Sequence, residues 1–215
     1  MIIYFVRHGS TDGNAANQFQ LPTIELSEKG KQEAEFMAKR FEKIPVDILF
    51  TSPMKRALQT ARAIGQHTGH PVIENALLEE IKRPSDVRGK SKEDPDVKEI
   101  MQDVKKHFTD SNWHHSDEEN YFEVRERATK VLEFLSTRTE EKILVVTHGE
   151  ILRMILGIVV FGETLTPEMF DHVKRAFIPF NTGITKIQYD PTIGYSESGW
   201  YVQAWNDHAH LEKEY

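Results

Sequence analysis

The chain has 215 residues, of which 39% are apolar and 28% are charged, and this composition suits one globular domain. Its 27 basic and 34 acidic side chains give a net charge of −7. A surface of that sign repels polyphosphate backbones, which argues against broad nucleic-acid binding. The absence of cysteine excludes disulfides, thiolate zinc sites and cysteine nucleophiles.

No apolar run reaches the length of a transmembrane helix, so we expect no membrane partner. The apolar run at the start of the chain is far shorter than the core of a signal peptide, and no positively charged segment precedes it. We therefore expect a cytoplasmic protein.

The first predicted element is a strand over Ile2–Val6, five apolar or aromatic residues of the kind that a parallel sheet buries on both faces. It is followed at once by Arg7, His8 and Gly9. Ligands of α/β sheets bind at the carboxyl ends of the strands, so these three residues form a candidate site. The alternative is a surface loop that merely contains them.

A polar stretch without periodicity follows as far as Pro22, and we predict a loop there. Ser27 is a predicted N-cap, and the apolar stripe behind it predicts a helix that ends near Lys43. The next elements are a strand at Asp47–Phe50, a helix that Ser52 and Pro53 open as N-cap and first residue, and a short strand at Val72–Glu74.

Residues 82–119 lose this pattern, and we predict that they form a cap-like insertion within a single domain of residues 1–215. A helix is predicted over Asp96–His107. The insertion opens with a basic cluster, Lys82 to Lys92. Such a cluster is usually a solvated face. If it faces the crevice instead, it favours a substrate with a second anionic group.

The pattern then resumes with a helix over Tyr121–Leu135 and a buried strand at Ile143–Val146, which runs into Thr147, His148 and Gly149. An apolar helix over Ile151–Val160 and an antiparallel pair, Gly183–Tyr189 with Trp200–Trp205, complete the chain. This alternation predicts an α/β fold: a three-layer α/β/α arrangement around a mainly parallel sheet.

Two buried strands thus end in the same way, and their imidazoles should meet at one edge of the sheet. Arg56, in the first turn of the helix after the second strand, belongs to the same edge, and Glu79 and Glu80 follow the third strand. Two histidines, two arginines and a carboxylate near helix N-termini make an oxyanion site, which suits phosphate best.

Three stretches carry a resemblance to a known family. They are Phe5-Val6-Arg7-His8-Gly9-Ser10-Thr11 with Asn14, the run Thr51–Ala61, and Val146-Thr147-His148-Gly149. Together they resemble the histidine phosphatase superfamily, also described as phosphoglycerate mutase-like. The likeness covers nearly the whole chain outside residues 82–119.

The resemblance implies roles for particular residues. His8 would attack phosphorus and become phosphohistidine, while Arg7, Arg56 and His148 would hold the phosphoryl oxygens. Asn14 is a further phosphate donor in this scheme. Glu80, in a segment similar to the family's Leu-x-Glu-Ile, would be the general acid. The scheme requires neither a metal nor a cofactor.

The function expected is hydrolysis of small phosphorylated metabolites. The alternatives are a cofactor-dependent phosphoglycerate mutase and a non-catalytic phospholigand-binding module. Mutases of the family usually carry Asn-Glu-Arg-x-Tyr-Gly around the acid, whereas this chain has Leu78-Glu79-Glu80-Ile81-Lys82. The resemblance allows a homodimer, and the sequence does not fix the oligomeric state.

The chain also departs from the family. It lacks the arginine that many members have around Asn17–Gln20, and this puts the substrate in doubt. His114 and His115 with Asp117 could suggest a metal site, but their spacing fits no ligand pattern well, and a solvated loop is the favoured interpretation. Asn181 and Thr182 could line the pocket or form a turn.

Overall fold

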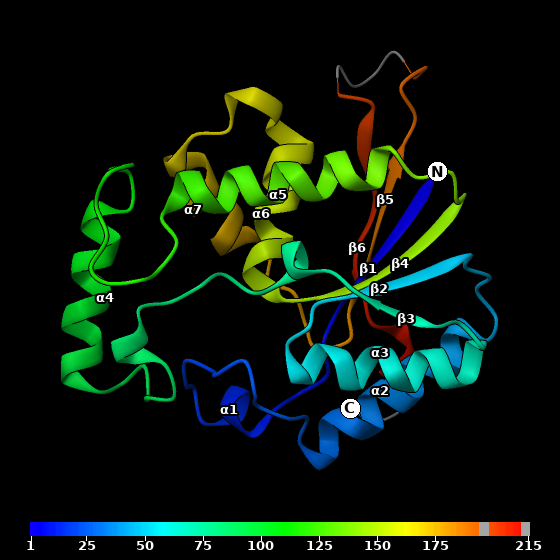
Figure 1. Cartoon of the computed structure of the whole chain (residues 1–215), viewed down its shortest axis with the longest axis horizontal. Helices are drawn as coiled ribbons and strands as arrows, with labels where there is room; N and C mark the ends of the chain where they lie inside the picture. The colour runs from blue at the N-terminus through cyan, green and yellow to red at the C-terminus, as the bar shows by residue number, and fades with distance from the viewer. Residues whose placement is uncertain (194–197, 212–215) are drawn as a thin grey trace.

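A six-stranded mixed sheet lies between two groups of helices in the computed structural model, which describes residues 1–193 and 198–211 (Figure 1). The strands are β1 (Ile2–Arg7), β2 (Ile48–Thr51), β3 (Val72–Glu74), β4 (Lys142–Thr147), β5 (Ile184–Tyr189) and β6 (Trp200–Asp207). The helices are α1 (Asp12–Ala15), α2 (Glu28–Phe41), α3 (Lys55–Thr68), α4 (Pro95–His107), α5 (Tyr121–Ser136), α6 (Gly149–Phe161) and α7 (Pro167–Ala176). The predicted three-layer α/β/α fold is confirmed.

The strand order β3-β2-β4-β1-β5-β6 places the two most buried strands side by side. The first four strands in this order are parallel, and β5 and β6 add an antiparallel edge. The register between β1 and β4 pairs Arg7 with Thr147. His8 and His148 therefore leave the sheet at the same level of the same edge.

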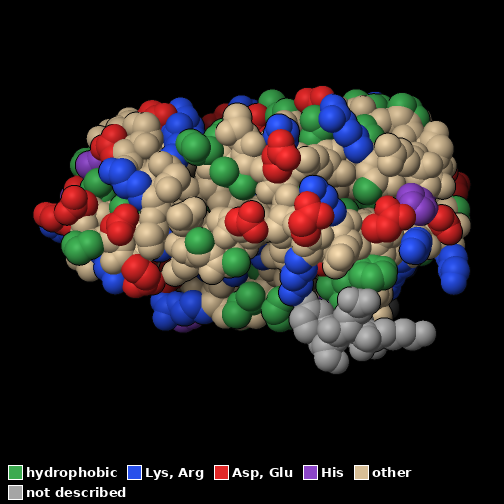
Figure 2. Space-filling model, turned by 90° about the horizontal axis from the view of Figure 1, so that it is seen from below, with side chains coloured by type: hydrophobic (Ala, Val, Ile, Leu, Met, Phe, Trp, Pro, Cys, Tyr) green, Lys and Arg blue, Asp and Glu red, His purple; other side chains and the backbone are tan. Residues whose placement is uncertain are grey.

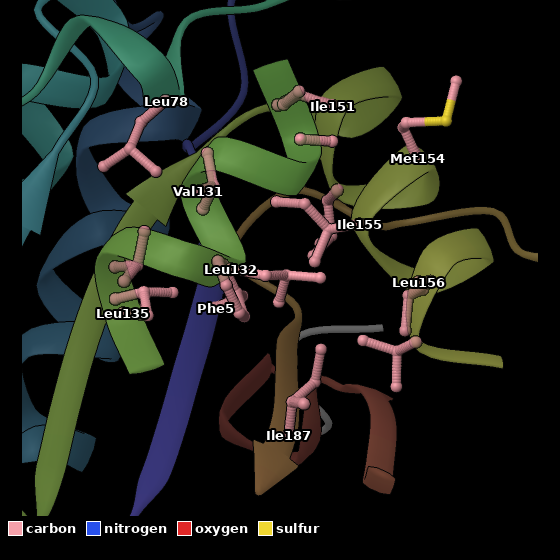
Figure 3. Close-up of a cluster of buried hydrophobic side chains, with 14 of the residues drawn as sticks. Phe5, Leu78, Val131, Leu132, Leu135, Ile151, Met154, Ile155, Leu156 and Ile187 are labelled. Atoms are coloured by element: carbon pink, nitrogen blue, oxygen red, sulfur yellow. The ribbon is translucent and has the colours of Figure 1, made fainter. Parts of the chain in front are cut away.

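Each face of the sheet has its own core, because neighbouring side chains of a strand point to opposite faces. Phe5 of β1 packs with α5 and α6, where Figure 3 shows it among the leucine, isoleucine and valine side chains of those helices. Val6, the next residue, packs with Met37 and Phe41 of α2 and with the apolar side of α3. Burial on both faces explains the uninterrupted apolar runs of β1 and β4.

Two predicted helix starts had different outcomes. The prediction for α2 is confirmed, since the Ser27 side chain accepts the Gly30 N–H at 3.1 Å. The prediction for α3 is wrong: Met54 is the N-cap, and Lys55 is the first helical residue. Ser52 instead accepts the Met54 N–H at 3.2 Å, so Ser52 and Pro53 belong to a turn before the helix.

Two helices were not predicted. In the stretch assigned to a loop, Thr11 and Asn14 form a capping box around the single turn of α1. The other is α7, whose N-cap Thr166 precedes Pro167 and whose buried side chains are Phe170 and Val173. A Thr-Pro start and apolar residues three apart are helix signals, and they were overlooked there.

The predicted helix in residues 82–119 is confirmed as α4, which stands apart from both helix layers at the left of Figure 1. Backbone hydrogen bonds join the start of this segment to the loop after α1. Phe19 N–H donates to the Lys90 carbonyl at 3.0 Å, and Lys92 N–H donates to the Asn17 carbonyl at 3.0 Å. Residues 17–19 and 89–92 therefore lie side by side.

Charged side chains of both signs alternate over the face seen from below in Figure 2. A surface of this kind agrees with the modest net charge of the chain. In the described parts of the chain, no helix combines the length and apolarity needed to cross a membrane.

Candidate active site

A cavity of about 590 Å³ lies at the carboxyl edge of β1 and β4. Five residues predicted for the site are in its wall: Arg7, His8, Asn14, Arg56 and Glu80. The sixth, His148, is fully buried and does not line the cavity, but its ring centre is 5.1 Å from that of His8. The fold thus brings the predicted residues together.

The His8 imidazole is fixed through both ring nitrogens. Nδ1 lies 2.7 Å from the Gly9 carbonyl, to which only a protonated nitrogen can donate. Nε2 then carries the lone pair, and it accepts the Nε–H of Arg56 at 3.1 Å. The backbone is held as well, because the Asn181 amide donates to the His8 carbonyl at 2.8 Å. The lone pair of Nε2 therefore points at Arg56, and this hydrogen bond must open before Nε2 can attack a substrate.

Electrostatics keep this imidazole neutral. His8 is 3% exposed, and burial lowers its pKa well below the usual 6.5. The positive charges of Arg56 and Arg7 lower it further, while the hydrogen bond to the Gly9 carbonyl acts in the opposite direction. A neutral imidazole near neutral pH is what a nitrogen nucleophile requires.

The two arginines offer fixed positive charge beside that nitrogen. Arg7 donates from its Nη1 to the Pro179 carbonyl at 2.6 Å, and its buried Nε has no partner among the described residues. Arg56 is 3% exposed, and burial together with Arg7 lowers its pKa to about 10, although Glu80 opposes this shift. Both guanidinium groups therefore remain charged at neutral pH.

His148 contacts the site from behind the cavity wall. Its Nε2 lies 2.8 Å from the Ser52 hydroxyl, and its Nδ1 is buried without a partner among the described residues. Burial, followed by the charge of Arg56, lowers its pKa well below 6.5. The Ser52 hydroxyl also accepts the Met54 N–H, and its own hydrogen can be donated to Nε2 of His148. In that arrangement Nδ1 carries the proton and is a hydrogen-bond donor.

Glu80 occupies the N-terminus of α6. Its carboxylate accepts the backbone N–H groups of Glu150 and Ile151 at 3.1 Å. It is also the charged group with the largest effect on both Arg7 and Arg56. The helix start and the two cations hold this carboxylate in one place.

Glu79 differs from its neighbour in its contacts. The alternation of an extended segment predicts that only one of the two residues faces the crevice, yet both line the cavity. The Glu79 carbonyl accepts Nη1 of Arg127 at 2.7 Å, and no hydrogen bond or ion pair involves the Glu79 carboxylate in the described parts of the chain. Only Glu80 therefore has a carboxylate anchored at the site.

Two asparagines considered for the site have specific partners. The Asn14 side-chain oxygen accepts from the backbone N–H and the hydroxyl of Thr11, so it caps α1 while its residue lines the cavity. Asn181 holds the His8 backbone as described. Its neighbour Thr182 donates its backbone N–H to the Arg7 carbonyl at 2.9 Å. The turn around residue 181 thus supports the Arg7-His8 segment.

Sequence reasoning missed several residues of the cavity wall, among them Arg127, Glu150 and Arg153. Burial raises the pKa of Glu150, but Arg83, Arg153 and Lys174 outweigh it and keep the carboxylate ionised. The signal for two of them was available, because Glu150 and Arg153 are the charged residues at the start of the otherwise apolar α6. Arg127, on the polar side of α5, had no comparable signal.

The basic cluster of the insertion faces this cavity, whose wall includes Lys82, Arg83, Arg88 and Lys92. Asp117 neutralises two of these cations, at 3.3 Å from Lys82 and 2.7 Å from Arg88. Arg83 lies 3.8 Å from Glu150. No carboxylate pairs with Lys92 among the described residues, and its ammonium lies 5.2 Å from the centre of the Phe19 ring.

The histidines of the insertion do not gather around one point. His114 pairs with Glu123 at 2.9 Å, and His115 pairs with Asp86 at 3.0 Å. Within residues 1–193 and 198–211, no group of three or more histidine or acidic side chains is arranged to hold a metal ion.

A neutral, oriented imidazole between two arginines, with an anchored carboxylate in the same cavity, can attack an electrophile that carries negative charge and then handle a proton. A tetrahedral phosphoryl group has that charge and size.

Comparisons with known proteins identify similar chains. The sequence model described as "Histidine phosphatase superfamily (branch 1)" matches residues 3–208. A 2,3-bisphosphoglycerate-dependent phosphoglycerate mutase of Cytophaga hutchinsonii is 29% identical over 191 residues, which cover 81% of this chain and 83% of that protein. An uncharacterized phosphatase of Bacillus subtilis, PhoE, is 25% identical over 97% of this chain and 96% of its own length.

Solved structures agree with the sequence comparisons. Bacillus stearothermophilus YhfR has a TM-score of 0.81 and 26% identity, with 98% of each chain covered.

Proposed function

We propose that this chain, which belongs to the histidine phosphatase superfamily (branch 1), hydrolyses small-molecule phosphomonoesters through a phosphohistidine intermediate. The observation that carries the proposal is the state of His8. Its Nε2 is the unprotonated ring nitrogen and lies beside Arg56, burial and two arginines keep the ring neutral, and Glu80 lies in the same cavity.

The reaction would proceed in two steps. His8 Nε2 forms a bond to phosphorus while the phosphorus–oxygen bond to the leaving alcohol breaks, and Glu80, in its protonated form, supplies the proton that this oxygen takes up and becomes a carboxylate. Water then attacks the phosphohistidine, Glu80 takes a proton from that water, and phosphate leaves His8 neutral again. Arg7 and Arg56, which line the cavity, would stabilise the equatorial oxygens in both steps, and His148 would do so once its ring, which lies behind the wall, reaches the cavity.

Hydrolysis is favoured over phosphoryl transfer by the segment around the acid. The mutase motif Asn-Glu-Arg-x-Tyr-Gly is absent, and the chain has Ile81 after Glu80 where that motif has arginine. The family includes both activities among its named relatives, a mutase and a phosphatase. The mutase is therefore the second candidate function.

The cations of the insertion support a substrate with a second anionic group. Lys92 lines the cavity and has no carboxylate partner among the described residues, and Arg83 has only a long contact to Glu150. A carboxylate or phosphate on the substrate would give both cations a partner. These residues would take the place of the arginine that the loop around Asn17–Gln20 lacks.

The test is a panel of phosphomonoesters, assayed for phosphate release, beside an assay of 3-phosphoglycerate with its bisphosphate primer for isomerisation. We expect release from several monoesters and little isomerisation. Predominant isomerisation would establish the mutase instead.

Trapping the intermediate tests the mechanism separately. After brief exposure to ³²P-labelled substrate and an acid-free quench, label should reside on His8 in a bond that is acid-labile and alkali-stable, as in a phosphoramidate. Label that survives strong acid, or that persists in His8→Ala, would contradict the assignment.

A further inference from the structure

A second cavity, of about 510 Å³, lies between α4 and α7 and adjoins the first. Ile81, Arg83 and Glu150 line both cavities, so the two share a wall. The sequence analysis assigned nothing to this space, which we call the α4–α7 groove.

The groove begins where the leaving group must emerge. In an in-line displacement the leaving oxygen lies opposite the attacking His8 nitrogen, next to the acid that protonates it. That acid is Glu80 in the proposed function, and Ile81 and Glu150 are its immediate neighbours, by sequence and by hydrogen bond. Carbon atoms attached to the leaving oxygen would then lie close to the shared wall.

The groove has both apolar and charged lining residues. Its apolar residues are Ile81, Met101, Val104, Phe108, Pro167 and Phe170, of which Met101, Phe108 and Pro167 are partly exposed. The Lys174 ammonium lies 5.2 Å from the centres of both the Phe108 and Phe170 rings, but Asp171 pairs with it at 3.0 Å. Asp171 also pairs with Arg175, and Glu150 pairs with Arg83. Because most charges of the groove pair with one another, neutral hydrocarbon fits the apolar side chains between them.

We propose that the α4–α7 groove binds a hydrocarbon portion of the leaving alcohol, so that the preferred substrates are phosphomonoesters with an extended apolar group. This inference rests on the proposed function, since the direction of the leaving group follows from His8 and Glu80. It extends that function by assigning the substrate's apolar part to a site built from α4 and α7.

The experiment compares n-alkyl phosphates from ethyl to octyl. The leaving alcohols from propyl upward have nearly the same acidity, so chain length changes binding and not the chemistry. Each methylene that leaves water contributes up to about fourfold, and we expect kcat/KM to rise on the order of tenfold to a hundredfold from ethyl to hexyl.

Variants test whether the α4–α7 groove causes the dependence of kcat/KM on chain length. Met101→Trp fills the groove and should reduce the hexyl-to-ethyl ratio to within about threefold. Gln102→Trp places the same indole on an exposed position of α4 outside the groove and should leave the ratio unchanged. Thr109→Trp narrows the same groove from the end of α4 and provides a second test if Met101→Trp does not fold. The ratio is internal to each variant and does not depend on its absolute activity.

A flat chain-length series in the unaltered protein would overturn the inference, as would a series that stays steep in both filled variants. Direct binding of n-alkylphosphonates, which cannot be hydrolysed, is measured by titration calorimetry and separates this failure from that of the proposed function. If no ester is hydrolysed but phosphonate affinity strengthens with chain length and Met101→Trp removes the trend, the groove stands and the hydrolytic mechanism fails.

Discussion

At the scale of single residues, Glu79 and Glu80 are neighbours in sequence but differ in their contacts, because backbone N–H groups hold only the Glu80 carboxylate. Glu80 is anchored by the first N–H groups of α6, whereas the hydrogen bonds of the next residue back, Glu79, involve its backbone carbonyl. Both residues line the cavity. Because both residues line the cavity, position alone does not distinguish the two candidates for the general acid. The contacts of the carboxylates favour Glu80.

We predict that Glu80→Gln loses on the order of 10²-fold in kcat/KM for an alkyl phosphate and much less for p-nitrophenyl phosphate, whose phenolate departs without a proton. Glu79→Gln is the matched control and should lose little, equally on both substrates. Steady-state assays of both esters measure this. If Glu79→Gln shows the leaving-group dependence and Glu80→Gln does not, the roles are reversed.

Arg56 illustrates how geometry matters beyond charge. Its Nε donates to His8, while its Nη1 donates to the Leu21 carbonyl at 3.1 Å. Lysine keeps the charge but cannot place donors in both directions. We predict that Arg56→Lys lowers kcat/KM on the order of 10²-fold, typical of losing a transition-state donor. A variant within about threefold of the unaltered protein would remove Arg56 from the mechanism.

At the scale of elements, α2 and α3 are joined at a distance from the site by a histidine. His67 of α3 lies between two carboxylates, with Nε2 at 2.7 Å from Glu35 and Nδ1 at 2.5 Å from Glu42. The hydrogen bond with Glu42 is the largest cause of a raised pKa for His67, and Glu35 adds to it. Both nitrogens are donors only when the ring is protonated.

The stabilising effect of His67 should therefore depend on pH. Because the folded-state pKa is raised above 6.5, the stabilisation is fully present below the unfolded value and is lost as pH rises through the folded value. We predict that His67→Gln lowers Tm most near pH 6 and least near pH 9. His172, exposed on α7, has no ion pair in the described parts of the chain, and His172→Gln is the control. Equal losses of Tm at both pH values would contradict the prediction.

The loop that follows His8 is also held by α2, whose backbone approaches it closely at Gly30. A Cβ on Gly30 of α2 would lie 1.9 Å from the Ser10 carbonyl oxygen. The buried Glu33 carboxylate accepts the Ser10 N–H at 2.6 Å and its hydroxyl at 2.8 Å. The N-terminal half of α2 thus fixes the loop that follows His8, so that His8, the proposed nucleophile, is supported by a helix as well as by its strand.

At the scale of the whole molecule, a chain with a net charge of −7 concentrates cations in one cavity. Arg7 and Arg56 come from the body of the domain, while Arg83 and Lys92 come from the insertion. Figure 1 shows that α4, which continues the insertion, stands at one side of the body. In the proposed function, the insertion would select the substrate and the sheet edge would carry out the chemistry.

We predict that Lys92→Ala raises KM on the order of tenfold for phosphomonoesters that carry a carboxylate, with little change for simple alkyl phosphates, because an ion pair to the second anion is lost. Lys90→Ala is the control, since Lys90 belongs to the same segment but does not line the cavity. Michaelis constants for matched substrates with and without a carboxylate test this. The same increase for both substrates would show that Lys92 does not contact a second anion.

The sequence by itself determined the features that depend on local patterns. The doubly buried strands β1 and β4 follow from uninterrupted apolar runs, and α2 follows from its Ser27 cap and its stripe of apolar residues. Because parallel strands present their carboxyl ends at one edge, the convergence of His8 and His148 could also be predicted.

Only the tertiary structure decided which polar side chains face the cavity. The pairing of residues 17–19 with 89–92 brings Lys92 to the site, and the contact of Glu80 with α6 brings in Glu150. The same structure buries His148 behind the wall that it was expected to line. These outcomes depend on contacts between residues far apart in the chain, and no local periodicity encodes such contacts.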